Sequence, residues 1–275
     1  MTDIGFMQGR LSPMVDGKIQ AFPWNHWRDE FGLANLHKFT CMEWTLDHDY
    51  LEYNPLMMEA GRSIIRLLSK RHNLKIRSLT GDCFMQSPFW KASDVQRAYL
   101  LKALRTILLS AAELGIELIL LPLVDNGSLE NESQTENLFS GLSTVQDLLN
   151  EYNLKIIFES DFPPDELQQF ISGLDPTCFG INYDVGNSAA LGYDPTEEIA
   201  AYGDRIYNVH IKDRLLGGTT VPLGMGDADL PKVLNLLKAN NYSGQYILQT
   251  ARAMNGDHTG MLCRYRDMVQ QWLGE

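Results

Sequence analysis

Two stretches of sequence decide the fold: Asn182-Tyr183-Asp184-Val185-Gly186-Asn187 and Tyr207-Asn208-Val209-His210-Ile211-Lys212-Asp213-Arg214. Each is a β-like run that ends in polar residues. The first offers a carboxylate, and the second offers an imidazole, a lysine and a further carboxylate. Charged groups at strand ends are poorly suited to a hydrophobic core and well suited to a functional site. We therefore predict that the two runs meet at one mouth of a barrel and hold a divalent metal ion there.

The rest of the chain alternates between strand-like and helical stretches. The strand-like runs are Ile4–Arg10, Cys41–Leu46, Lys75–Leu79, Glu117–Val124, Lys155–Glu159, Phe179–Asp184, Ile206–Lys212 and Gln245–Gln249. The helical patterns between and after them include Glu30–His37, Asn54–His72, Asp94–Leu114, Ser133–Asn150 and Thr259–Leu273. Such alternation is typical of parallel strands, and eight units predict an α/β fold, a (β/α)8 TIM barrel, as a single domain over residues 1–275. An open doubly wound sheet is the alternative, but Gly5–Arg10 lacks the GxGxxG pattern expected after its first strand.

The composition indicates a large, acidic, globular chain. It has 275 residues, a hydrophobic share of 44% and a net charge of −12 from 23 basic and 35 acidic residues. A surface of this sign repels nucleic acid and anionic membranes. The N-terminus lacks the features of a signal peptide, and no apolar run approaches the roughly 20 residues of a membrane span. We expect a cytoplasmic protein without nucleic acid or membrane partners, whose four widely spaced cysteines are reduced thiols.

Four polar residues stand at the ends of the last four predicted strands: Glu159, Asp184, His210 and Gln249. A single such residue is more often a hydrogen-bonding group than a ligand. Residues on successive strands can converge, however, because functional groups of a TIM barrel gather at the carboxyl ends of the strands. Two carboxylates, an imidazole and an amide oxygen suit Mn²⁺, Mg²⁺ or Co²⁺ better than a structural zinc, which favours thiolates.

Further side chains at the same mouth are candidate substrate contacts. Glu43 and Lys212 are predicted to contact substrate instead of a metal ion, and the alternative is a buried ion pair that fills the barrel mouth. Arginines at strand ends could bind an anionic group or balance the carboxylates: Arg10, Arg214 and Arg252. Loop aromatics could stack on a sugar or cover the barrel: Trp24, Trp27, Phe89 and Trp90. A further aromatic residue, Trp44, is expected to be exposed, at the interface of a homo-oligomer.

The sequence resembles the xylose isomerase-like TIM-barrel superfamily, the sugar phosphate isomerase/epimerase and AP endonuclease family 2-like group, over most of its length. The motifs that carry the resemblance are Phe158-Glu159-Ser160, Tyr183–Asn187, Val209–Arg214, Leu223-Gly224-Met225-Gly226-Asp227 and Asn241–Gly244. The resemblance implies that Glu159, Asp184 and His210 hold a catalytic divalent metal (Mn²⁺, Co²⁺, Mg²⁺ or Zn²⁺) and that the partner is a small carbohydrate.

One position departs from the family pattern. The eighth strand normally ends in a glutamate that acts as both ligand and acid/base group, and here Gln249 occupies that position. An amide oxygen can coordinate a metal, but it brings no charge and cannot take a proton. Because the charge is missing, we expect weaker metal affinity than in a site with three carboxylates. Epimerisation needs two acid/base groups, whereas isomerisation or syn dehydration can use one. The favoured hypothesis is a one-base isomerase or dehydratase, with Glu159 as base and Lys212 stabilising the oxyanion. If Lys212 acted instead as a second acid, the protein could be an epimerase.

Two other functions are weighed against this hypothesis. The endonuclease IV-like proteins of the superfamily hold several zinc ions with extra histidines from the third and fourth strands. Those strands end here in Thr80-Gly81-Asp82 and Val124-Asp125, and the net charge of −12 opposes DNA binding. The second alternative is a catalytically degenerate barrel that binds a sugar or polyol without turnover.

Overall fold

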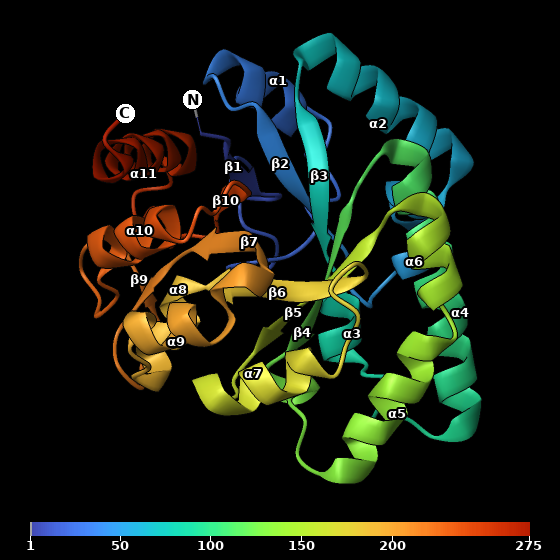
Figure 1. Cartoon of the computed structure of the whole chain (residues 1–275). Coiled ribbons are helices and arrows are strands. Elements are labelled where there is room, and N and C mark those ends of the chain that lie inside the picture. The colour runs from blue at the N-terminus through green and yellow to red at the C-terminus, as the bar shows by residue number, and fades with distance from the viewer. Residues whose placement is uncertain (1) are drawn as a thin grey trace.

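The computed structural model describes residues 2–275 and consists of a closed barrel of parallel strands surrounded by helices (Figure 1). Around the barrel, neighbours are β1 (Ile4–Met7), β10 (Gln245–Leu248), β7 (Ile206–Ile211), β6 (Phe179–Asp184), β5 (Lys155–Ser160), β4 (Leu118–Leu123), β3 (Lys75–Thr80) and β2 (Cys41–Thr45). A short antiparallel pair, β8 (Asp213–Arg214) and β9 (Thr220–Val221), follows β7 outside the barrel. The predicted (β/α)8 TIM barrel is confirmed.

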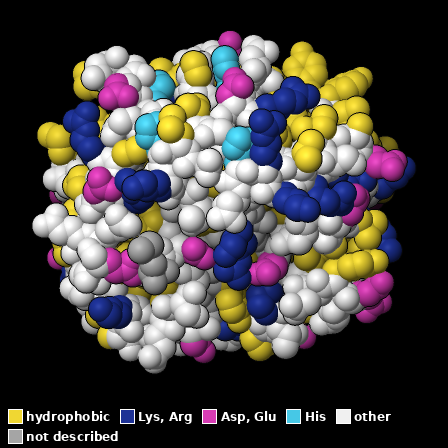
Figure 2. All heavy atoms as spheres, turned by 90° about the horizontal axis from the view of Figure 1, so that it is seen from above, with side chains coloured by type: hydrophobic (Ala, Val, Ile, Leu, Met, Phe, Trp, Pro, Cys, Tyr) yellow, Lys and Arg dark blue, Asp and Glu magenta, His cyan; other side chains and the backbone are white. Residues whose placement is uncertain are grey.

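The helices form the outer layer of the molecule. They are α1 (Asp29–Leu36), α2 (Glu59–His72), α3 (Asp82–Gln86), α4 (Asp94–Leu114), α5 (Glu132–Ser143), α6 (Gln146–Tyr152), α7 (Pro164–Ser172), α8 (Val185–Leu191), α9 (Pro195–Tyr202), α10 (Leu230–Ala239) and α11 (His258–Leu273). No helix within residues 2–275 has the length and apolar character needed to cross a bilayer. Figure 2 looks down on the face seen from above Figure 1, where basic, acidic and apolar side chains are intermixed.

The structure corrects the sequence-based boundaries of several helices. The helix expected from Asn54 begins at Glu59, because the Asn54 side chain accepts a hydrogen bond from Leu56 N and caps a separate 3₁₀ turn. The stretch Ser133–Asn150 is divided between α5 and α6, which are separated at Thr144 and Val145. The short helices α3 and α8, which follow β3 and β6 directly, were not predicted.

The aromatic residues pack into the protein interior instead of its surface. Trp44 is fully buried, and its Nε1 donates a hydrogen bond of 3.0 Å to Asn54 Oδ1, so the predicted exposure of Trp44 at an interface is wrong. Its strand, β2, lies between β1 and β3, and side chains of a closed barrel face either the interior or the helical layer. Trp27, Phe89 and Trp90 are also buried.

A buried carboxylate fixes the loop that follows β1. Glu30, on α1, is fully buried and accepts hydrogen bonds of 2.9 to 3.0 Å from Gly9 N and Leu11 N. These contacts hold the backbone on both sides of Arg10. Burial raises the pKa of Glu30 to about 7, although the two backbone N–H groups favour its ionised form.

We predict that Glu30 makes the stability of the protein fall as the pH rises. Because its pKa is higher in the folded than in the unfolded chain, the folded state binds more protons between about pH 4.5 and 7. Glu30 alone should lower the free energy of unfolding by up to about 1.4 kcal/mol per pH unit in that range. Urea unfolding at several pH values would give the free energy of unfolding as a function of pH. Between about pH 4.5 and 7, the free energy of wild type minus that of Glu30→Gln should fall as the pH rises. A constant difference between the two curves would contradict this role.

Candidate metal centre at the barrel mouth

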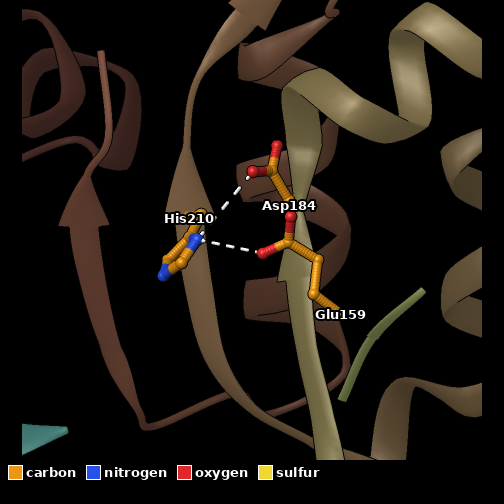
Figure 3. A group of neighbouring side chains, drawn as sticks. All are labelled: Glu159, Asp184 and His210. Atoms are coloured by element: carbon orange, nitrogen blue, oxygen red, sulfur yellow. Dashed lines mark ion pairs between the residues drawn. The ribbon is translucent and has the colours of Figure 1, made fainter. Parts of the chain in front are cut away.

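Three predicted metal ligands converge at the carboxyl ends of neighbouring strands. Glu159 on β5, Asp184 on β6 and His210 on β7 are all buried, and each offers one ligand atom within 4.8 Å of the others. His210 Nδ1 lies 3.3 Å from Glu159 Oε2 and 3.8 Å from Asp184 Oδ2. Figure 3 shows both carboxylates pointing toward the same edge of the imidazole ring. The arrangement provides a buried, anionic group of three side chains that could hold a metal ion.

A carboxylate behind the imidazole sets the orientation of the ring. Glu43 Oε1 lies 2.7 Å from His210 Nε2, and Glu43 Oε2 accepts hydrogen bonds from Ser78 Oγ at 2.6 Å and Asn208 Nδ2 at 2.9 Å. With Nε2–H donated to Glu43, Nδ1 is the nitrogen that faces Glu159 and Asp184. Glu43 is fully buried and its oxygens contact three protein partners, an arrangement suited to orienting His210; its predicted contact with substrate stays a prediction.

The charges of the cluster are strongly coupled. Burial acts to lower the pKa of His210, but Glu43, Asp184 and Glu159 together raise it well above its ordinary value. Burial likewise acts to raise the pKa of Asp184, and Lys212 and His210 hold it well below its ordinary value. A proton on His210 therefore balances part of the negative charge. A divalent cation would take over that role with release of the proton, as expected for a histidine ligand.

Amide side chains that sequence reasoning missed hold Glu159 in place. Glu159 Oε2 accepts from Asn182 Nδ2 at 2.9 Å, and Oε1 accepts from Asn187 Nδ2 at 2.6 Å. Asn182 in turn accepts from Asn208 Nδ2 at 2.7 Å, which links Glu159 to Glu43 across the barrel interior. Both Asn182 and Asn208 lie two residues before a predicted ligand. Strand alternation places them on the same face as that ligand, a signal present in the sequence.

Two cations border the carboxylates. Lys212, just after β7, places Nζ 2.8 Å from Asp184 Oδ2 and 3.2 Å from Asn187 Oδ1. Arg214 Nη1 donates to the same Asn187 oxygen at 2.8 Å. The Lys212 stem lies against Gly186, where an added Cβ would come within 2.7 Å of Lys212 Cγ. The absence of a side chain at Gly186 thus allows the lysine to reach Asp184.

A cavity of about 340 Å³ opens at this mouth. The predicted site residues that line it are Glu159, Lys212, Gln249, Arg10 and Arg214, and the lining residues that were not predicted include Gln20 and Asp82. Trp24 is not among the residues that line it, and its ring packs edge-to-face on Phe22 at 4.8 Å; the predicted contact of Trp24 with substrate stays a prediction.

Other hollows lie at the opposite ends of the strands. Hollows of about 380 and 610 Å³ are bordered by residues such as Lys75, Leu118 and Ile206. These are the first residues of β3, β4 and β7. That end of a TIM barrel contributes to stability, whereas its active sites lie at the carboxyl ends. The smaller cavity beside Glu159 is therefore the candidate site.

Two unpaired buried atoms indicate that the cluster fits a metal ion. His210 Nδ1 and Gln249 Oε1 are two of the eight buried side-chain atoms within residues 2–275 that make no hydrogen bond, and His210 Nδ1 has only its ion-pair contacts with Glu159 and Asp184. Buried polar atoms are nearly always paired, so such exceptions point to a missing partner. Both are ligand atoms of the predicted metal set, together with the carboxylates of Glu159 and Asp184.

We predict that Glu43→Gln weakens the binding of Mn²⁺ about 10- to 100-fold although every predicted ligand remains, because the imidazole loses its orienting carboxylate. Isothermal titration calorimetry would measure the affinity, and circular dichroism would check the fold. Glu117→Gln, the same change at an exposed carboxylate at the other end of the barrel, is the control. Equal affinities for Glu43→Gln and wild type would refute the positioning role.

Comparison with known proteins places the chain among characterised barrels. An L-ribulose-5-phosphate 3-epimerase, UlaE, of Escherichia coli O8 (strain IAI1) is 24% identical over 256 residues, 89% of each chain. An inosose dehydratase of Clostridium tetani (strain Massachusetts / E88) is 28% identical over 152 residues, which span 46% of this chain and about half, 51%, of the dehydratase.

Solved structures show the same fold. A D-allulose 3-epimerase from Methylomonas sp. superimposes with a TM-score of 0.77 at 15% identity, over 99% of this chain and 98% of the epimerase. The IOLI protein, solved with a zinc atom, superimposes with a TM-score of 0.75 at 16% identity, over 98% of this chain and 99% of that protein. The model of the family described as xylose isomerase-like TIM barrel matches residues 31–261, and the chain belongs to this family.

Proposed function

We propose that this protein is a metal-dependent enzyme that transfers a proton next to the carbonyl group of a small carbohydrate, as a one-base isomerase or dehydratase. The observation that carries the proposal is the buried cluster of Glu159, Asp184 and His210 beside a cavity that Glu159 itself lines. The relatives, an inosose dehydratase and a sugar phosphate epimerase, support a carbohydrate substrate and favour an enzyme over a barrel that only binds sugar.

The residues suited to hold the metal are Glu159, Asp184, His210 and Gln249. Their two carboxylates balance a divalent charge, and the two unpaired atoms, His210 Nδ1 and Gln249 Oε1, lack other partners. The zinc atom of the structurally similar IOLI protein supports a divalent ion of this kind. When bound, such an ion supplies Lewis acidity that polarises the carbonyl and hydroxyl oxygens of a substrate.

Glu159 is the proposed general base. Its carboxylate lines the cavity, and the amide donors Asn182 and Asn187 hold it in one orientation. Glu159 removes a proton from the carbon next to the carbonyl. In an isomerisation it then returns that proton to the former carbonyl carbon, while the hydroxyl proton moves from its own oxygen to the former carbonyl oxygen; in a syn dehydration it gives the proton to the departing hydroxyl group, which leaves as water. Gln249, at the end of the eighth barrel strand, has no proton-accepting group, which is why a one-base reaction is favoured.

Lys212 is the proposed donor to the developing oxyanion. Two of its three N–H groups are directed to Asp184 and Asn187, which leaves a third for a ligand in the cavity that Lys212 lines. A fixed cation at this place stabilises negative charge that forms on oxygen as Glu159 takes the proton.

We predict that the Mn²⁺-loaded protein exchanges the hydrogen next to the carbonyl of its substrate with D₂O, and that Glu159→Gln reduces this exchange about 10²- to 10⁴-fold. Nuclear magnetic resonance on a panel of ketoses, aldoses and inososes, each with and without phosphate, would measure the exchange and identify the product. Glu166→Gln, at an exposed position on α7, is the matched control. Near-normal turnover by Glu159→Gln would rule out this mechanism.

An epimerase is the second candidate, because the cavity holds a further carboxyl group. Asp82, at the start of α3, lines the same cavity as Glu159. Burial, with smaller contributions from Asp47 and Glu159, raises the pKa of Asp82 to about 6, against the opposing effect of hydrogen bonds from Gln20 and Thr80. A group with this pKa can gain or lose a proton near neutral pH. Asp82 would then serve the opposite face of the substrate.

The same exchange measurement separates the two candidates. In a one-base reaction, Asp82→Asn should keep turnover within a few-fold of wild type, and the product should be an aldose–ketose isomer or a dehydrated compound. In a two-base epimerisation, Asp82→Asn should lose about 10²-fold or more, and the product should be an epimer.

A further inference from the structure

Gln20 connects three polar groups at the edge of the cavity. It lies in the loop between β1 and α1 and is partly buried. Gln20 Oε1 accepts a hydrogen bond from Gln249 Nε2 at 2.9 Å and lies 3.4 Å from Arg10 Nη2, which also donates to it. Gln20 Nε2 donates to Asp82 Oδ2. One amide therefore links Arg10, Asp82 and Gln249.

The two charged neighbours determine which end of the Gln20 amide faces which way. Arg10 is a donor only, and its Nε and Nη1 already donate to the backbone oxygens of Thr250 and Ile19 at 3.1 and 2.6 Å. An ionised carboxylate such as that of Asp82 is an acceptor only. The Gln20 oxygen therefore faces Arg10, and the Gln20 NH₂ group faces Asp82. In the reverse orientation, two donors would face each other at Arg10 and two acceptors would face each other at Asp82.

This orientation determines that of Gln249 in turn. Gln249 must present its NH₂ group to the Gln20 oxygen, so its own oxygen points away from Gln20. The backbone of Gln249 is fixed beside β7, because its N–H donates to Ile211 O at 3.0 Å. The oxygen that remains, Gln249 Oε1, is buried and makes no hydrogen bond within the described residues. An acceptor that is buried, oriented and unpaired is suited to a cation.

We propose that Gln20, held by Arg10 and Asp82, is a positioning residue that turns the Gln249 amide oxygen toward the metal centre as a neutral ligand. The inference rests on the metal centre of the proposed function. It gives Arg10 a role other than the predicted contact with substrate, since its three hydrogen-bonding nitrogens are directed to protein oxygens. It also makes Gln20 and Gln249 a matched pair. A glutamate at position 249 would place a carboxylate oxygen against Gln20 Oε1, and two acceptors would then face each other.

Metal titration of four variants tests the proposal without a substrate. Mn²⁺ affinity is measured by calorimetry, and the visible absorption of bound Co²⁺ reports the ligand set. Gln20→Met removes the acceptor and should weaken Mn²⁺ binding about 10-fold or more and change the Co²⁺ spectrum. The double change Gln20→Glu with Asp82→Asn keeps an acceptor toward Gln249 and a donor–acceptor pair between positions 20 and 82, so its affinity should stay within a few-fold of wild type. Gln86→Met, the same substitution at another residue of the cavity lining that does not contact Gln249, is the control.

The fourth variant, Gln249→Leu, tests whether Gln20 affects metal binding through Gln249. In that background, Gln20→Met should cause no further loss of affinity, because the two residues act as one unit. Wild-type affinity in Gln20→Met, or a loss there together with unchanged affinity in Gln249→Leu, would overturn the inference. Absence of divalent binding by the wild-type protein would instead refute the proposed function, so the two failures are distinguishable. Thermal melting of each variant separates loss of binding from loss of fold, and Gln20→Ala, which also removes the acceptor, takes the place of Gln20→Met if that variant does not fold.

Discussion

The hydrogen bond between His210 Nε2 and Glu43 Oε1, at 2.7 Å in the barrel interior, is the contact on which the mouth of the barrel depends. It joins β7 to β2 across the barrel, and it leaves only one imidazole nitrogen for the other carboxylates. The remaining oxygen of Glu43 is satisfied by Ser78 and Asn208. Buried polar groups of this kind stabilise a structure only when they are fully paired. Glu43 beneath the site is paired in this way, whereas two of the described buried atoms that make no hydrogen bond, His210 Nδ1 and Gln249 Oε1, belong to predicted metal ligands.

Charge balance explains how so many acidic groups share one small region. Glu43, Glu159 and Asp184 surround a single imidazole, and the nearby cations are Lys212 and Arg214. The carboxylates retain a proton on His210 and draw Lys212 onto Asp184. Such a cluster would be unfavourable in a purely structural core, where apolar side chains of similar volume pack as well or better. Its retention at the carboxyl ends of the strands therefore favours a functional role.

The alternation of strands and helices was readable from the sequence, because buried parallel strands are short apolar runs and their helices carry amphipathic patterns. Glu159, Asp184 and His210 were predicted because each ends such a run. The role of Glu43 was not, because its partner His210 lies 167 residues further along the chain. Gln20 was missed because it lies in a loop that reaches the cavity only through tertiary folding, and Asp82 was missed although it follows the third strand, where a polar residue was a signal for the site. Trp44 was misplaced because the sequence does not show that its face of β2 is covered by other aromatic rings.

The central claim is that the three converging side chains form a metal centre. Elemental mass spectrometry of purified, undialysed protein tests it most directly, with the wild type measured beside His210→Ala. About one Mn, Co, Zn or Mg ion per chain in the wild type, lost in His210→Ala, is the predicted result, because removal of the imidazole leaves too few ligands. No metal in either protein, even after Mn²⁺ is added, would contradict the claim and leave a barrel that binds sugar without a metal ion.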